Sequence, residues 1–221
     1  MEEWNILPEQ VETKFDGKFI RVYDLQYAPG QHYFDASRRV PEELVAVKNA
    51  QEAKEMLPDA VSCVVILCLP NEEPKLLLTY EYRYPAGRYL LSVPAGLIDP
   101  EDRLLEEPLL ATAKREIEEE TGIQAGPDAV FRVINPFAYS TPGMSDESNA
   151  LVSVVLPLEN TNGLNQEGCV GSEKFDGFEL VTQEEAKELL AGGRDKYGNF
   201  YSMYTWAALV WFVTGSWKNG I

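Results

Sequence analysis

The sequence has little of several residue types on which common catalytic and metal sites depend. His32 is the only histidine and lies in an expected turn, which favours an exposed side chain over a histidine-activated nucleophile. The three cysteines, Cys63, Cys68 and Cys169, lack the spacing of a zinc site, and two of them lie in an expected strand. We interpret them as reduced thiols, which predicts a cytoplasmic protein.

Long apolar segments and basic charge are also scarce. The longest apolar run, 61–69, is too short to span a bilayer and is typical of a buried strand. The opening stretch MEEWNILPEQ has neither the basic part nor the apolar run of a signal peptide. With 36 acidic against 19 basic residues, the formal net charge of −17 repels nucleic acid. We expect no membrane and no nucleic-acid partner, whereas a small phosphate-bearing ligand can be neutralised locally.

The hydropathy pattern predicts a chain of mixed strands and helices. A hairpin is expected where KFIRVYDLQYA and HYFDASRRV flank the turn Pro29–Gly30. The segment ELVAVKNAQEAKEMLPDA fits either a strand and loop or a short helix. Further strands are expected at VSCVVILCLP, KLLLTYEYRYP, VFRVINPFAYS and ALVSVVLPLE, and helices at Pro108–Thr121, from Thr182 with a capping box to Glu185, and from Met203. This order of elements favours an α/β/α sandwich.

Three carboxylates, Glu116, Glu119 and Glu120, lie within one turn of the expected helix, in the stretch REIEEETGI. Like charges at this spacing destabilise a helix by ~0.2–0.5 kcal/mol per pair. Thr121–Gly122 supplies a helix stop, which places the acids near the negative end of the helix dipole. A solvated acidic face is one interpretation. A bound Mg²⁺ would reverse the electrostatic cost, because Mg²⁺ prefers carboxylate, water and phosphate oxygens.

Residues 96–123 resemble a Nudix box, whose pattern is G, five residues, E, seven residues, then REUxEExGU with U aliphatic. The second half matches throughout from Arg115, and Glu107 has the required seven-residue separation from Arg115. Ten residues separate Gly96 from Glu107, so this register implies a five-residue insertion before Glu107. A register that keeps five residues lands on Asp102. We favour Glu107, because helix spacing is fixed and loop length is not.

The flanking segments resemble the ADP-ribose pyrophosphatase branch of that family. YEYRYPAGRYLLSVPAGLID is similar to its Q-F/Y-R-x-P and E-x-P-A-G-x-I-D approach, and YSTPGMSDE to its S-x-P-G-x-S/T-x-E loop. The resemblance implies the α+β Nudix fold, an α/β/α sandwich with a mixed sheet at 58–221, plus a small antiparallel N-terminal subdomain at 1–57 that serves dimerisation. It also implies hydrolysis of ADP-ribose or another ADP-sugar to AMP and a sugar phosphate, with Mg²⁺ or Mn²⁺.

Carried over residue by residue, the resemblance implies a metal site and a catalytic base. The implied metal ligands are Glu116, Glu119 (which could also act in catalysis), Glu120 and the carbonyl of Ala95. Gly96 after it lets the backbone approach the metal closely, and Arg115 is expected to orient Glu119. The base in this branch comes from a loop after the box, and the candidates are Glu173, which we favour narrowly, Asp176 and Glu147. For each of these acids alone, a solvated loop position is the default.

The implied substrate contacts are spread over the chain. Arg83 resembles the phosphate-contacting arginine of the branch, and a guanidinium suits phosphate oxygens. From the N-terminal part, Arg38 or Arg39 is expected to reach across a homodimer, and Phe19 and Phe34 are candidates to stack on adenine, although a strand aromatic is more often core. The remaining implied contacts are Gly96, Pro142 and Gly143.

Other functions share much of this sequence pattern. A Nudix hydrolase for another nucleotide sugar or a dinucleotide would differ only in its pocket. A ligand-sensing module without turnover is the second alternative, because the insertion changes the loop that feeds the metal site. An isomerase of isopentenyl diphosphate would need a catalytic cysteine, and the strand position of Cys63 and Cys68 argues against it.

Overall fold

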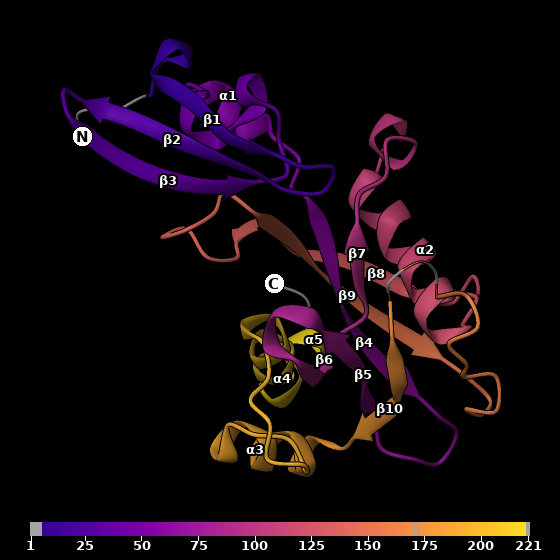
Figure 1. The fold of residues 1–221 in the computed structure, drawn as a ribbon. Coiled ribbons are helices and arrows are strands. Elements are labelled where there is room, and N and C mark those ends of the chain that lie inside the picture. Colours follow the sequence, from indigo (N-terminus) through magenta and orange to yellow (C-terminus); the bar gives the residue numbers. More distant parts are fainter. Residues whose placement is uncertain (1–5, 170, 172, 220–221) are drawn as a thin grey trace. The chain divides into compact units, whose positions relative to one another are not determined.

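The computed structural model describes residues 6–169, 171 and 173–219, and the chain divides into two compact units (Figure 1). The N-terminal unit comprises Met1–Asp59 and Pro136–Asn149, and the second comprises Ala60–Asn135 and Ala150–Ile221. The sequence prediction placed residues 136–149 in the hydrolase domain. In the structure these residues group by contact with the N-terminal unit, where Ser145 forms a bridge with Ala36 of β3.

The N-terminal unit is built on a three-stranded antiparallel sheet with the order β1-β2-β3. Its strands are β1 (Val11–Asp16), β2 (Arg21–Ala28) and β3 (Gln31–Ser37). The predicted hairpin is confirmed, with Ala28 opposite Gln31 and Gly30 at φ +69°, a backbone angle that glycine adopts without strain. Strand β1 was not predicted. The run expected to start at KFI is broken instead by a turn in which Gly17 N–H donates to the carbonyl of Ile20.

A short helix and three single turns complete this part of the chain. Helix α1 (Ala50–Glu55) is the helical alternative of the sequence analysis, and Asn49 caps it in a capping box with Glu52. The 3₁₀ turns here are Pro8–Gln10, Pro41–Glu43 and Val45–Val47. Tyr23, Leu25 and Leu44 form a small buried cluster.

The second unit contains the larger sheet, whose main order is β10-β5-β4-β9-β8. Strand β6 pairs with β5 and β7 pairs with β4. The strands are β4 (Ala60–Cys68), β5 (Lys75–Arg83), β6 (Arg88–Ser92), β7 (Ala95–Leu97), β8 (Val130–Tyr139), β9 (Ser148–Pro157) and β10 (Phe175–Val181). Two further 3₁₀ turns are Tyr84–Ala86 and Asp102–Leu104.

Helices cover both faces of this sheet, which confirms the predicted α/β/α sandwich. One face packs on α2 (Pro108–Thr121), through a core that includes Leu77 and Ile117. The other packs on α3 (Gln183–Gly192) and α4 (Met203–Val213), through a core that includes Leu78 and Leu209; α5 (Ser216–Asn219) follows α4. Successive strand residues point to opposite faces, so neighbouring leucines of β5 enter different cores.

Helix α2 has the boundaries that its sequence predicts. Pro108 occupies the first turn, where its missing N–H is not needed, and Gly122 ends the helix at φ +71°.

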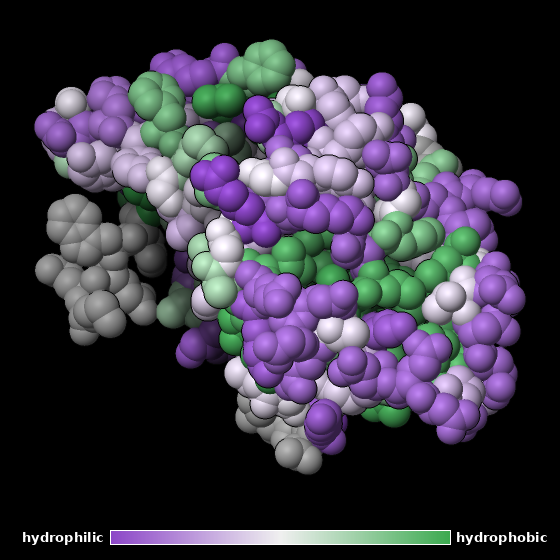
Figure 2. All heavy atoms as spheres, turned by 90° about the horizontal axis from the view of Figure 1, so that it is seen from below, coloured by the Kyte–Doolittle hydropathy of each residue, from purple (hydrophilic) through white to green (hydrophobic). Residues whose placement is uncertain are grey.

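Among the described residues no helix is long and apolar enough to cross a membrane. Figure 2 shows the molecule from below the view of Figure 1. This face carries mostly hydrophilic residues, with apolar areas between them.

Candidate active site

Helix α2 buries two of its three clustered carboxylates against the sheet. Glu116 is 5% exposed and Glu120 is 3% exposed, whereas Glu118 between them faces solvent. The two buried acids share a helix face with Ala113 and Ile117, which belong to the core. The packing of α2 therefore fixes both carboxylates on the inner side of the helix, and a merely solvated acidic face is excluded for them.

Strand β7 approaches these acids closely enough to require glycine. A Cβ built on Gly96 would lie 2.0 Å from the Glu116 carboxylate. One residue earlier, Ala95 N–H donates to Glu120 Oε1 at 3.3 Å. Pairing of Ala95 with Ser62 and of Gly96 with Val61 holds this backbone against β4. Gly96, which was predicted to let the backbone approach a metal, lies here against the Glu116 carboxylate.

Arg115 organises the exposed side of the cluster. Its Nη1 lies 2.6 Å from Glu116 Oε1 and 3.0 Å from Glu119 Oε2, so the predicted pairing of Arg115 with Glu119 is present. Its Nη2 donates to the Leu97 carbonyl at 2.8 Å and to Asp102 Oδ2 at 3.2 Å. The Arg115 guanidinium therefore links α2 to β7 and to the loop between β7 and α2.

The structure reverses our choice of register for the first half of the box. Asp102 is buried and accepts hydrogen bonds from Arg115 and from the Thr112 hydroxyl at 3.0 Å, whereas Glu107 is exposed at the N-cap of α2. Asp102 keeps the five-residue separation from Gly96. In this register the extra residues lie after Asp102, in an exposed loop.

Burial and mutual repulsion disfavour the charged forms of Glu116 and Glu120. Burial, with a contribution from Glu119, raises the pKa of Glu116 to about 7, although Arg115 opposes the rise. Burial followed by the charges of Glu81 and Glu116 raises the pKa of Glu120 well above its ordinary value. Glu120 Oε2 is buried and has no hydrogen-bond partner among the described residues. A bound cation would give this oxygen the partner that it lacks among the described residues.

The donor set fits a divalent cation. Carboxylate oxygens from Glu116 and Glu120, beside a backbone that only glycine allows to come close, are the ligands that Mg²⁺ and Mn²⁺ prefer. Within the described ranges, no three acidic, histidine or cysteine side chains already surround a point that could hold a metal ion. Glu119, which is paired with Arg115 and partly exposed, would have to turn inward to add a third carboxylate.

Sequence reasoning missed a further acid, Glu81 on β5. It is 9% exposed, and its Oε2 lies 2.5 Å from Nη2 of Arg83, the predicted phosphate contact. Burial, then repulsion from Glu173, raises the pKa of Glu81, with Arg83 opposing. The alternation along β5 from Leu77 was the signal that could have placed Glu81 on the α2 face.

The three candidate bases lie in different surroundings. Glu173 is exposed just before β10, and its charge contributes to the raised pKa values of Glu116, Glu120 and Glu81, so it lies within electrostatic range of the buried acids. Asp176 is exposed within β10. Glu147 belongs to the N-terminal unit, where it pairs with Arg38 at 3.2 Å.

The substrate contacts predicted in the N-terminal unit divide into buried and exposed residues. Arg39 is 8% exposed and pairs with Asp59 at 2.9 Å and Asp146 at 3.3 Å. It is therefore committed to a buried network in this unit. Phe19 and Phe34 are 70% and 58% exposed, so neither is a core aromatic.

The loop that contains Pro142 and Gly143 is fastened to β3 of the same unit. The Tyr33 hydroxyl donates to the Gly143 carbonyl at 2.8 Å, and Ala36 N–H donates to the Met144 carbonyl at 3.0 Å. Pro142 lines a cavity of about 200 Å³ between this loop and the sheet. Side-chain and backbone hydrogen bonds therefore hold this loop against β3.

The scarce histidine and cysteines form no site of their own in the described part of the chain. His32 Nδ1 lies 2.9 Å from both oxygens of Asp24, and its ring is about half exposed. All three cysteines are free thiols. Burial raises the pKa of Cys169 to about 11, with smaller effects of Glu120 and Glu173, so this thiol is a poor nucleophile near neutral pH.

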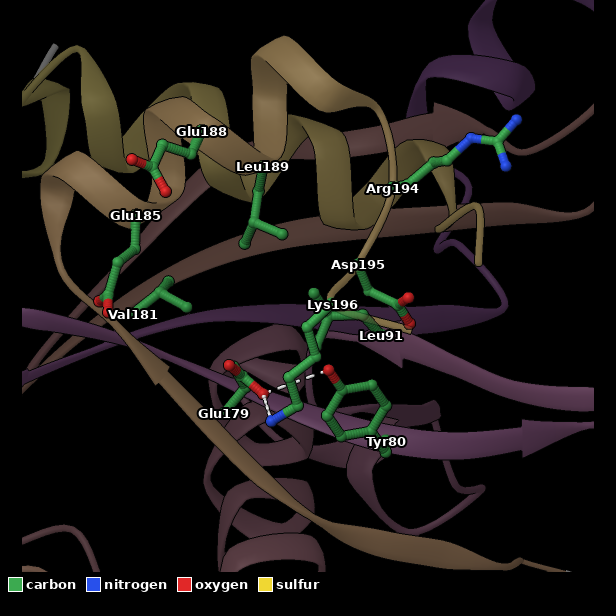
Figure 3. Close-up of a pocket in the computed structure, with 10 residues that line it drawn as sticks. All are labelled: Tyr80, Leu91, Glu179, Val181, Glu185, Glu188, Leu189, Arg194, Asp195 and Lys196. Atoms are coloured by element: carbon green, nitrogen blue, oxygen red, sulfur yellow. Dashed lines mark hydrogen bonds and ion pairs between the residues drawn. The ribbon is translucent and has the colours of Figure 1, made fainter. Parts of the chain in front are cut away.

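A separate cavity of about 280 Å³ lies between β5, β10 and α3 (Figure 3). There the Tyr80 hydroxyl donates to Glu179 Oε2 at 3.1 Å, and Lys196 Nζ lies 2.5 Å from the same oxygen. Tyr80 and Glu81 are consecutive on β5, so their side chains point to opposite faces of the sheet. This cavity is therefore on the α3 side, away from the buried carboxylates of α2.

The chain resembles known proteins in sequence and in fold. The chain is 29% identical over 190 residues to the ADP-ribose pyrophosphatase of Bacillus subtilis, covering 86% of this chain and 84% of that protein. It is 29% identical over 117 residues to the ADP-sugar pyrophosphatase of Mus musculus, covering 53% and 50%. A crystal structure of an ADP compounds hydrolase has a similar fold, with a TM-score of 0.55, 21% identity and coverage of 95% of this chain and 92% of that chain. The NUDIX domain family matches residues 56–203, about two thirds of the sequence, and the chain therefore belongs to the Nudix family.

Proposed function

We propose that this protein hydrolyses the diphosphate bond of ADP-ribose, or of a closely related ADP-sugar, to AMP and a sugar phosphate, and that its divalent cation is Mg²⁺ or Mn²⁺. The observation that carries the reaction class is the pair of buried carboxylates, Glu116 and Glu120, beside the glycine-dependent approach of β7. The similarity to the ADP-ribose pyrophosphatase of Bacillus subtilis and to the ADP-sugar pyrophosphatase of Mus musculus supports the choice of substrate.

The reaction requires charge neutralisation on the diphosphate and a positioned water. The divalent cation, when bound, supplies Lewis acidity and lowers the pKa of water. The proposed ligands are Glu116, Glu120 and the Ala95 carbonyl, with Glu119 available once it leaves Arg115. In this proposal Arg83, 48% exposed beside Glu81, contacts a phosphate oxygen through its planar fork.

A carboxylate base completes the scheme, and we favour Glu173. Its charge reaches the buried acids, and it is exposed, so it can accept a proton from the attacking water and release it to solvent. Asp176 and Glu147 remain the alternatives. Single amide replacements of the three acids separate them, because only the true base should lower kcat by about 10²-fold or more with little change in KM.

The test of the proposed function is AMP release from ADP-ribose with and without Mg²⁺, alongside ADP-glucose, NADH and diadenosine polyphosphates. We expect Mg²⁺-dependent turnover that is strongest with ADP-ribose and lost in Glu120→Gln. The matched control is Glu118→Gln, the same substitution two residues away on the exposed face of α2. Preference for another of these substrates would replace ADP-ribose as the proposed substrate. Binding of ADP-ribose without any turnover would identify a sensor instead of a hydrolase.

Two finer features belong to the same proposal. We propose a homodimer assembled through the N-terminal unit, whose buried cluster is small for an independent domain. Light scattering after size exclusion tests it, and a monomer that retains full activity would refute it. In that dimer, the proposed contacts to the substrate of the partner are Phe19, Phe34 and Arg38. Arg39 instead supports the loop through Asp59 and Asp146.

The free thiols support a reducing, cytoplasmic setting as part of this proposal.

A further inference from the structure

Glu81 lies on the same side of the sheet as the carboxylates of helix α2. Leu77 packs in the core beneath α2, whereas Leu78 and Tyr80 belong to the core on the α4 side. Because strand residues alternate between faces, Glu81 and Arg83 follow Leu77 onto the α2 side. The Tyr82 N–H donates to the Lys174 carbonyl at 2.8 Å, which keeps this end of β5 in the sheet.

Glu81 is buried beside one arginine and within the electrostatic field of further acids. Among the described residues its ion-pair partner is Arg83, whose side chain is 48% exposed. The acids that share its electrostatic field are Glu120 and Glu173, and its effect on Glu120 exceeds that of Glu116. A buried carboxylate among carboxylates is strongly unfavourable unless a cation compensates it.

We propose that Glu81 is an additional carboxylate of the metal centre, contributed by β5 to the site that the acids of α2 would form. This inference rests on the proposed function, since it assigns a further residue to the same site. Glutamine stands at this position in the branch pattern to which YEYRYP was compared. Glutamate in its place adds a full negative charge, so this chain should bind its cation more tightly than a glutamine variant.

The competing explanation is that Glu81 only anchors Arg83. The two explanations make different predictions for Glu81→Gln. An anchor without contact to the cation would leave metal affinity unchanged and would weaken substrate binding through Arg83. A carboxylate that faces the cation would lower metal affinity even in the absence of substrate. It would also leave the metal-free protein as stable as the parent or more stable, because one buried like charge is removed.

The experiment measures Mn²⁺ binding to the substrate-free full-length protein by calorimetry at pH 8. We expect Glu81→Gln to lower the Mn²⁺ affinity by about tenfold or more, the range found for groups that support a metal site. Glu179→Gln is the matched control: it makes the same change one strand away, on the face that carries Tyr80, and should leave the affinity unchanged. Equal affinity of Glu81→Gln and the parent would overturn the proposal.

A second variant keeps the proposal testable if Glu81→Gln does not fold. Arg83→Met removes the cation beside Glu81 and should raise the Mn²⁺ affinity, because the carboxylate is then released towards the metal. An unchanged or lower affinity would count against the proposal.

The outcome for this inference can be separated from the outcome for the proposed function. A parent that binds Mn²⁺ without hydrolysing ADP-ribose refutes the function alone. Hydrolysis with no effect of Glu81 refutes this inference alone, and a parent that binds no Mn²⁺ refutes both.

Discussion

Replacing Glu116 by glutamine should stabilise the metal-free protein above pH 7 while removing metal-dependent hydrolysis. The pKa of Glu116 is raised to about 7 by burial and by Glu119, against the attraction of Arg115. Between the ordinary pKa of 4.5 and about 7, the folded protein holds a proton that the unfolded chain has lost. The native state then binds more protons than the unfolded state, so the free energy of unfolding falls as the pH rises through this window.

The magnitude follows from the shift. A rise from 4.5 to about 7 corresponds to about 3 kcal/mol of lost stability once the group is fully ionised, at about 1.36 kcal/mol for each pH unit. The attraction of Arg115, whose Nη1 lies 2.6 Å from Glu116 Oε1, is already contained in this shift. A glutamine does not ionise, so the variant should keep up to about 3 kcal/mol that the parent loses by pH 8.

The assay is urea unfolding in the presence of EDTA at pH 5, 6, 7 and 8, followed by tryptophan fluorescence. Trp206 and Trp211 lie on α4 in the unit that carries Glu116, so they report on the relevant unfolding. Glu118→Gln is the control and should follow the parent at every pH, because Glu118 is exposed. A Glu116→Gln variant that is less stable than the parent at pH 8, or that shows the same pH slope, would refute the reasoning.

Three further predictions concern neighbours of the same cluster. In Gly96→Ala the added Cβ, 2.0 Å from the Glu116 carboxylate, must displace that side chain, so hydrolysis should fall by about tenfold or more while circular dichroism is unchanged. Asp102→Asn should destabilise the protein by about 1–3 kcal/mol in thermal unfolding, because it weakens a buried charged hydrogen bond to Arg115, whereas an effect of equal size in Glu107→Gln would contradict the register seen here. Arg83→Lys should raise KM for ADP-ribose more than it lowers kcat, since a lysine loses the bidentate geometry; steady-state kinetics would disprove this if only kcat changed.

Much of the fold and of the metal cluster follows from local pattern. The boundaries of α2 depend on Pro108 and Gly122, whose backbone preferences act within one helical turn, and the structure agrees with both. The pairing of Arg115 with Glu119 follows from helix spacing alone. Such features were predictable because the interacting residues are close in sequence.

The errors arise where residues distant in sequence meet. The choice between Glu107 and Asp102 depended on which acid returns to Arg115, and a bent loop brings Asp102 back across 13 positions where helix spacing gave no guidance. Strand β1 was missed because its partner residues on β2 fix it, and most of its own residues are exposed. The grouping of residues 136–149 with the N-terminal unit also depends on a distant contact, the bridge between Ser145 and Ala36 of β3.

Glu81 was missed because it stands where the compared pattern has glutamine, so the pattern gives an acid at this position no role. Its significance depends on burial, on the face of β5, and on the field of acids from α2 and from the segment before β10. Natural sequences are generally consistent from local pattern to global packing, and they depart from that consistency mainly at functional sites. An apolar residue at position 81 would suit the buried strand better. The presence of a carboxylate there, together with the unpartnered oxygen of Glu120, is most simply explained if the cluster folds around a cation that both acids face.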